Sequence, residues 1–98
     1  MVSFPVLVVS DHRLFPGDPD RLVQALAACL RGGARGIEVG DLDLAGHDML
    51  ALALRLRETT RQAGGFLLVA ERADVALAAG ADGVHLGRGS LPAPAVRR

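Results

Sequence analysis

The chain has 98 residues, and its 11 basic and 11 acidic side chains give a formal net charge of zero at neutral pH. This balance argues against a nucleic-acid partner or an anionic membrane surface, because both favour a basic protein. Half of the residues are apolar, so we expect one small domain with a buried core, over residues 1–98. The chain has no lysine, so every basic residue apart from histidine is an arginine, which excludes mechanisms that need a lysine.

The single cysteine, Cys29, excludes an internal disulfide. Its apolar neighbours predict a buried structural thiol. The first residues lack the pattern of a signal peptide, and no apolar run approaches the roughly 20 residues that span a bilayer. We therefore expect a cytoplasmic protein.

The first half of the chain predicts two strands around one helix. The apolar run Phe4–Ser10 is typical of a strand buried on both faces of a parallel sheet. Asp18 before Pro19 predicts a helix start, and glycines at 32 and 33 predict its end. A short strand is expected at Gly36–Val39.

The second half continues the alternation. A long helix is predicted from about residue 46 to 63, with Arg55, Arg57 and Arg61 mostly facing solvent. The elements expected after it are a strand over residues 66–70, a helix over 73–79, a strand over 83–86 and a further helix with Pro92 near its start.

This alternation predicts an α/β fold of parallel βα units, either in an open doubly wound sheet or as part of a (β/α)8 barrel. In both architectures the site lies just past the carboxyl ends of the strands. Four carboxylates follow the first three predicted strands and could surround one pocket that holds a hard cation: Asp11, Asp41, Asp43 and Glu71. The alternative is helix capping, which is the favoured interpretation for Asp43 and a weaker one for Asp11.

The three histidines offer no ligand-like spacing. His85 lies within an apolar strand, where a hydrogen-bonded histidine in the core or in a pocket wall is the better interpretation. Surface positions are expected for His12 and His47. The loop from Gly87 to Gly89 has backbone N–H groups that could bind a phosphate, although two glycines are a weak signal.

Several sequence pieces together resemble the N-terminal half of the thiamine phosphate synthase and TenI-type family. They are Leu-Arg-Gly-Gly-Ala at 30–34, Asp-Leu at 43–44, Arg-Ala-Asp-Val-Ala-Leu at 72–77 and, above all, Gly-Ala-Asp-Gly-Val-His-Leu-Gly at 80–87. The resemblance implies about half of a TIM (β/α)8 barrel. It also implies a Mg²⁺-dependent transferase that joins an aminopyrimidine diphosphate to a thiazole phosphate and releases pyrophosphate.

The chain departs from that family at the positions that bind substrate and metal. The synthases carry Gln-x-Arg-x-Lys after the second strand, where this chain has Glu38, Gly40 and Leu42. They carry Asn-Asp after the third strand, where Ala70 and Glu71 stand; Glu71 could still reach a metal.

After the fourth strand the synthases carry Gly-Gln-x-Asp. This chain has Gly87 and Arg88 and then Ser90 in place of the second metal ligand. The resemblance thus implies a substrate side formed by Glu38, Gly40, Leu42, Ala70, His85, Gly87 and Arg88, with Glu71 as the remaining metal ligand.

A full barrel needs about 200 residues or more, so the chain accounts for about half of one. We expect either a fragment of a longer protein or a short product that dimerises or needs a partner, because four strands leave two open sheet edges. We expect no synthase activity from these 98 residues alone. The alternatives are a non-catalytic half-barrel that binds a phosphate or thiazole ligand or regulates, and a gene remnant.

Overall fold

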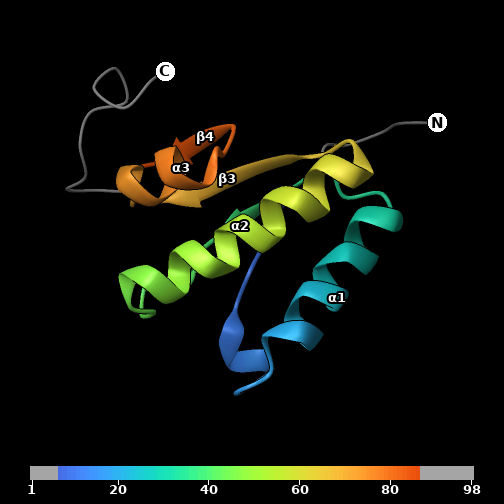
Figure 1. Ribbon diagram of the computed structural model, residues 1–98. Coiled ribbons are helices and arrows are strands. Elements are labelled where there is room, and N and C mark those ends of the chain that lie inside the picture. The colour runs from blue at the N-terminus through green and yellow to red at the C-terminus, as the bar shows by residue number, and fades with distance from the viewer. Residues whose placement is uncertain (1–6, 87–98) are drawn as a thin grey trace.

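The computed structural model describes residues 7–86. Its elements are β1 (Leu7–Val9), the 3-10 helix η1 (His12–Leu14), α1 (Pro19–Arg31), β2 (Gly36–Val39), α2 (Gly46–Ala63), β3 (Phe66–Ala70), α3 (Ala73–Ala79) and β4 (Gly83–His85). The strands form one parallel sheet in the order β1-β2-β3-β4. The predicted alternation of parallel βα units is therefore confirmed, and each helix connects two neighbouring strands (Figure 1).

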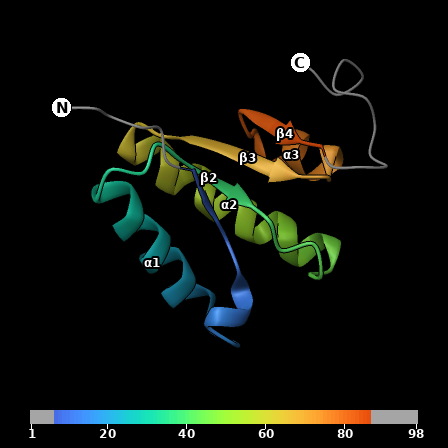
Figure 2. The same ribbon diagram turned by 180° about the vertical axis from the view of Figure 1, so that it is seen from behind.

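All three α-helices cover the same face of this sheet, as the opposite views in Figures 1 and 2 show. The hydrophobic core fills the layer between them. Ile37, Leu67 and Val69 point into it from the strands, and Met49 and Leu56 pack against them from α2; all five are fully buried.

The second face of the sheet is open in the part of the chain that the structure describes. Alternate residues along a strand point to opposite faces, so the neighbours of the core residues lie here. Leu7 and Val9 of β1 are 39% and 55% exposed, and Phe66 of β3 is 36% exposed. The prediction that the first strand is buried on both faces is thus wrong for its described residues, because no element among residues 7–86 covers the second face. Residues 4–6 of that predicted strand lie outside the described residues.

The helix ends follow from local chemistry. The Asp18 carboxylate accepts a hydrogen bond from the backbone N–H of Arg21 at 3.1 Å, and Pro19 is the first residue of α1, as predicted. The second helix spans residues 46–63, as predicted, and Gly64 ends it in the left-handed conformation with φ of 73°. Its N-cap is Ala45, whose side chain makes no capping bond. The capping role predicted for Asp43 is therefore wrong.

Two side chains lie elsewhere than predicted. Cys29 is exposed, because it lies at the margin of the α1 stripe whose buried residues are Leu22, Leu26 and Leu30. Arg57, which was expected to face solvent, has a side chain only 14% exposed because it forms an ion pair with Asp82. The sequence pattern shows the apolar stripe of a helix but not which polar residues at its edge find a partner.

Candidate functional site

Polar side chains gather where the strands end. We call the residues that directly follow β1, β2 and β3 the strand-end rim: residues 10–13, 40–43 and 71–72. Three of the four predicted carboxylates lie around one hollow of about 260 Å³, while Glu71 is not among its lining residues. The hollow is lined by Val9, Ser10, Asp11, Arg13, Gly40, Asp41 and Asp43.

A buried hydrogen-bond network joins the ends of β1 and β2. The Ser10 hydroxyl donates to the Asp41 carboxylate and accepts from the Gly40 N–H at 3.1 Å. The backbone N–H of His12 donates to the other Asp41 oxygen at 2.6 Å. Ser10 and Asp41 are 3% and 2% exposed. Because both oxygens of this buried carboxylate are satisfied, Asp41 fixes the two loops relative to each other.

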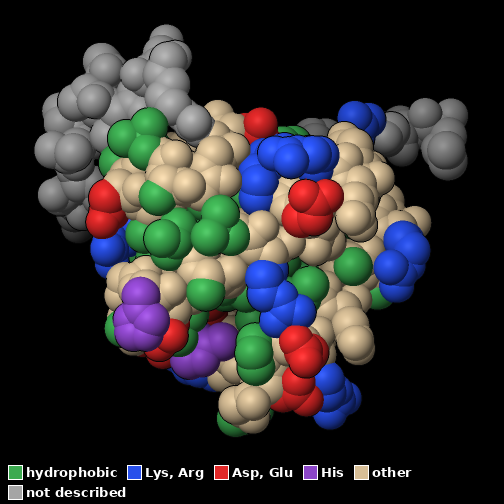
Figure 3. Space-filling view, viewed as in Figure 1, with side chains coloured by type: hydrophobic (Ala, Val, Ile, Leu, Met, Phe, Trp, Pro, Cys, Tyr) green, Lys and Arg blue, Asp and Glu red, His purple; other side chains and the backbone are tan. Residues whose placement is uncertain are grey.

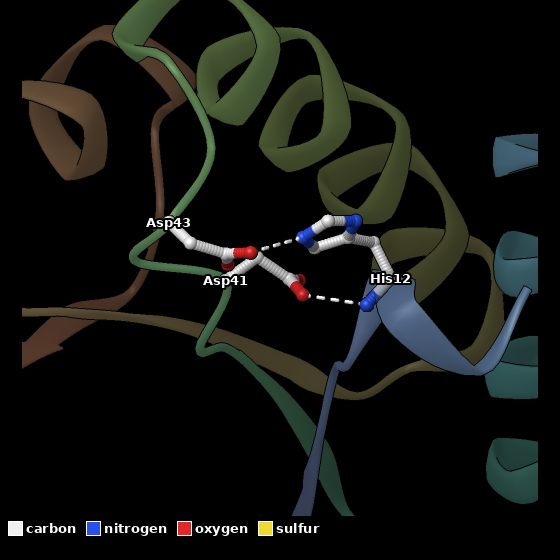
Figure 4. A group of neighbouring side chains, drawn as sticks. All are labelled: His12, Asp41 and Asp43. Atoms are coloured by element: carbon white, nitrogen blue, oxygen red, sulfur yellow. Dashed lines mark hydrogen bonds and ion pairs between the residues drawn. The ribbon is translucent and has the colours of Figure 1, made fainter. Parts of the chain in front are cut away.

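His12 and Asp43 complete this corner of the rim (Figure 4). The His12 Nε2 atom lies 2.8 Å from an Asp43 oxygen. This hydrogen bond lowers the pKa of the Asp43 carboxyl below its ordinary value. One ligand atom from each of His12, Asp41 and Asp43 lies within 4.8 Å of the others, a spacing that could hold a metal ion. His12 was expected at the surface, and its side chain is 32% exposed; its bond to Asp43, 31 residues away, is one that sequence spacing could not show.

The two arginines of the rim are both engaged by carboxylates. Arg13 Nε donates to Asp11 at 2.9 Å, and this side-chain hydrogen bond lowers the pKa of Asp11. Asp11 also caps η1 through the backbone N–H of Arg13 at 3.0 Å, so the capping interpretation of Asp11 is confirmed. Arg72 donates to Asp74 at 2.8 Å and lowers the pKa of that carboxyl to about 2. The described rim therefore has no excess of positive charge.

Glu71 has a strained backbone. Its φ is 65°, the one positive value for a non-glycine residue in the described part of the chain. The N–H of Arg72 donates to the carbonyl oxygen of Ala70 at 2.7 Å, so Glu71 is the central residue of a γ-turn with positive φ. The Glu71 N–H donates to the His85 carbonyl oxygen at 2.9 Å, which holds this turn against β4. Such strain clusters at functional sites.

Glu38 and His85 meet on the open face of the sheet. The His85 Nδ1 atom lies 2.8 Å from a Glu38 oxygen, between strands that β3 separates. The Glu38 side chain is 9% exposed and that of His85 is 63% exposed. His85 is thus hydrogen-bonded, as predicted, and lies on the open face rather than in the core.

The other residues that the resemblance placed on the substrate side are scattered. Leu42 is 52% exposed, and Ala70 is 8% exposed at the end of β3. Gly40 lies against Val9, since a Cβ atom on Gly40 would lie 2.6 Å from Val9 Cγ1. Gly87 and Arg88 lie outside the described residues.

The opposite end of the sheet carries a structural link. The Asp82 carboxylate accepts from the Leu67 N–H at 2.8 Å and from Arg57 Nη1 at 2.6 Å. The Asp82 N–H also donates to the Leu67 carbonyl oxygen at 2.8 Å. One residue therefore joins the start of β4 to the start of β3 and to α2. Residues at this end of parallel strands commonly serve stability rather than catalysis.

Ion pairs also mark the surface on the helix side. In Figure 3 basic and acidic side chains lie next to one another over the helices. The described helices include none long and apolar enough to cross a membrane.

The chain has a parallel βα sheet with polar loops and a strained turn at the carboxyl ends of its strands. These features are typical of α/β proteins whose functional site lies at that end of the sheet. Residues 6–98 match the family model described as thiamine monophosphate synthase, and the chain belongs to this family.

Named relatives share this similarity. A thiamine-phosphate synthase of Roseiflexus sp. is 45% identical over 93 residues, which cover 95% of this chain and 39% of the relative. A thiamine-phosphate synthase of Methanoculleus marisnigri is 42% identical over 97 residues, covering 99% and 45%. The chain thus spans less than half the length of these relatives.

A solved structure shows the same arrangement. The thiamine phosphate pyrophosphorylase from Pyrococcus furiosus is 32% identical and superimposes with a TM-score of 0.78 over 94% of this chain and 43% of that one. The α/β sheet described above therefore corresponds to about half of a TIM-type barrel.

Proposed function

We propose that the chain forms the N-terminal half of a thiamine phosphate synthase-type barrel, and that these 98 residues alone do not couple the two substrates of that reaction. The charge of the strand-end rim carries this proposal. Asp41 and Asp43 flank Leu42, where the family pattern has a lysine, and Gly40 stands where it has an arginine. The substrate side would consist of Glu38, Gly40, Leu42, Ala70, His85, Gly87 and Arg88.

The electrostatics of this rim oppose the reaction. Loss of a diphosphate leaving group requires cations placed where its negative charge develops. The guanidinium groups of Arg13 and Arg72 are each held by an aspartate within 3 Å, so neither offers unopposed charge. An incoming diphosphate would instead meet the Asp43 carboxylate, whose side chain is 57% exposed, with the buried Asp41 carboxylate in the same hollow.

The family implies Mg²⁺. Two places at the rim differ in how well they suit this ion: Glu71, and the corner formed by His12, Asp41 and Asp43. Mg²⁺ prefers oxygen ligands and commonly takes one or two carboxylates together with waters and phosphate oxygens. The Glu71 carboxylate makes no hydrogen bond within residues 7–86 and fits as such a ligand. The corner at His12 does not fit, because it supplies a nitrogen and because both oxygens of Asp41 already accept hydrogen bonds. When bound, Mg²⁺ would neutralise part of the diphosphate charge.

A direct assay tests the proposal. The purified chain is incubated with the aminopyrimidine diphosphate, the thiazole phosphate and Mg²⁺, and thiamine phosphate is measured by chromatography, with a full-length family synthase as the positive control. We expect no product from the 98 residues. Detectable turnover would contradict the proposal, because it would show that the acidic rim supports catalysis.

A charge-restored variant separates the rim from the missing strands. Gly40→Arg and Leu42→Lys restore the cations, and Val9→Ala removes the Cγ1 atom that a Gly40 side chain would meet at 2.6 Å. By calorimetry we expect this triple variant to bind inorganic pyrophosphate more tightly than the Val9→Ala control, and still to make no thiamine phosphate. Unchanged pyrophosphate binding would show that rim charge is not the obstacle.

A further inference from the structure

Each outer strand of the described sheet has one unpaired edge. β1 pairs only with β2, and β4 pairs only with β3. The Ser10 N–H donates to the Glu38 carbonyl oxygen of β2, so alternation along the strand turns the Val9 N–H toward the open edge. The His85 carbonyl oxygen faces β3, and the Val84 N–H is likewise turned outward. Open edges of this kind invite pairing with another strand.

The two edges are complementary. β1 and β4 each have three residues and run in the same direction. Rotation about a twofold axis parallel to the strands keeps their direction, so β4 of one copy meets β1 of a second copy in a parallel pairing, and the same contact occurs again on the other side. Both edges are then paired and eight strands close, a number whose interior side chains can fill.

The open face has the composition of an interface core. Leu7, Val9 and Phe66 are its exposed large apolar side chains. Its charged pair, Glu38 with His85, is already hydrogen-bonded at 2.8 Å, so burial would leave neither group without a partner. The net charge of the chain is zero, so two copies do not repel each other through their overall charge.

We propose that two copies of this chain associate through these edges and this face as a closed, twofold-symmetric barrel. The second copy covers the apolar side chains and completes the ring of strand ends, of which one chain forms only half. This assembly is independent of the synthase activity discussed above: a dimer without activity and a monomer without activity are distinct results.

Light scattering after size-exclusion chromatography tests the assembly. We expect a discrete species of twice the 10.2 kDa chain mass. A monomer at micromolar concentration would overturn the proposal. A continuous series of larger aggregates would overturn it as well, because such a series forms when the edges pair from copy to copy without closing into a barrel.

A matched pair of variants locates the interface. Val9→Glu puts a charge on the open face at a side chain that is 55% exposed, and Leu77→Glu puts the same charge on the outside of α3 at one that is 59% exposed. We expect Val9→Glu to weaken dimerisation by about 100-fold or more, and Leu77→Glu to leave it unchanged. Circular dichroism checks that both remain folded. Equal effects, or dissociation by Leu77→Glu alone, would exclude the proposed surface.

Hydrogen exchange of the unmodified chain distinguishes barrel closure from other dimers. The Val9 and Val84 amides face the edges, so in the closed dimer they should exchange on the order of 100-fold more slowly than in a dilute, monomeric sample. The Ile37 amide in the central strand β2 serves as the internal reference. A dimer in which the two edge amides stay unprotected would overturn the closed-barrel arrangement.

Discussion

The two ends of the sheet differ in how they use charged residues. At the start of the strands, Asp82 receives a backbone N–H and an arginine, and it joins three elements of the fold. At the strand-end rim, Asp11 pairs with Arg13 two residues away, and Glu71 holds a backbone conformation that glycine would adopt more easily. At the rim only the buried Asp41 joins distant segments, whereas Asp11 pairs locally and Glu71 is held under backbone strain.

Substitutions in the two kinds of position should therefore have opposite effects on the free energy of unfolding. A carboxylate that bonds to several distant elements holds them together, so its removal should lower the free energy of unfolding of the whole fold. A rim residue with a strained backbone lowers the stability of the fold. Its replacement by a residue that adopts the same conformation without strain should therefore raise the free energy of unfolding.

Asp82→Ala should have the largest effect. It removes the acceptor of the Leu67 N–H and leaves Arg57, whose side chain is 14% exposed, without its carboxylate. Since Asp82 is itself 47% exposed, we expect a loss of about 2–3 kcal/mol in the free energy of unfolding, below the range for fully buried pairs. Urea denaturation measures it.

Asp20→Ala is the matched control for Asp82→Ala. Asp20 forms an ion pair with Arg55 at 2.8 Å, but both side chains are well exposed. We expect a loss of under about 1 kcal/mol. Equal losses for the two variants would show that Asp82 is an ordinary surface charge.

Glu71→Gly should stabilise the protein. Glycine adopts a positive φ without the clash of a Cβ atom, and strain at such a position costs roughly 1–3 kcal/mol. The larger conformational entropy of glycine in the unfolded state offsets part of this gain. We therefore expect a net increase of about 1 kcal/mol in the free energy of unfolding, measured by thermal or urea denaturation. Glu71→Gln keeps the backbone strain and should leave stability unchanged. Destabilisation by Glu71→Gly would mean that the side chain contributes more than the strain costs.

The smallest effect is a pH dependence at the rim. The Arg72 side-chain hydrogen bond lowers the Asp74 pKa from 3.8 to about 2. A lowered folded-state pKa contributes stability above the unfolded value, and this contribution disappears as the pH falls from about 4 to about 2. Carbon NMR titration should place the Asp74 midpoint near 2, and Arg72→Gln should return it toward 3.8. An ordinary midpoint in the unmodified chain would contradict the pairing.

Much of the fold could be predicted because local signals agree with one another. Three signals define elements at the predicted places: the Asp-Pro start of α1, the glycines that end α1 and α2, and the apolar run Phe66–Ala70. The exposed face of β1 could not be predicted, because an apolar strand has the same composition whether or not a partner covers it. Which faces are buried depends on the other elements present.

The sequence predicts where the candidate site lies but not which of its side chains contact one another. The strand ends gave the rim and its carboxylates, since parallel strands end at one edge. Sequence could not show that Asp41 is enclosed by Ser10 and His12, which lie 31 and 29 residues away. The γ-turn at Glu71 was also hidden, because glutamate gives no local signal for a positive φ.

Periodicity, capping residues and motifs close together along the chain are enough to predict the helices, the strands, their parallel direction and the family to which the chain belongs. The tertiary structure sets which carboxylates connect elements and which arginines are neutralised. It also sets which face of the sheet stays open. These properties depend on side chains brought together from distant positions in the chain. The free energies of their ion pairs and hydrogen bonds depend on burial and on distances between atoms, which no local pattern encodes.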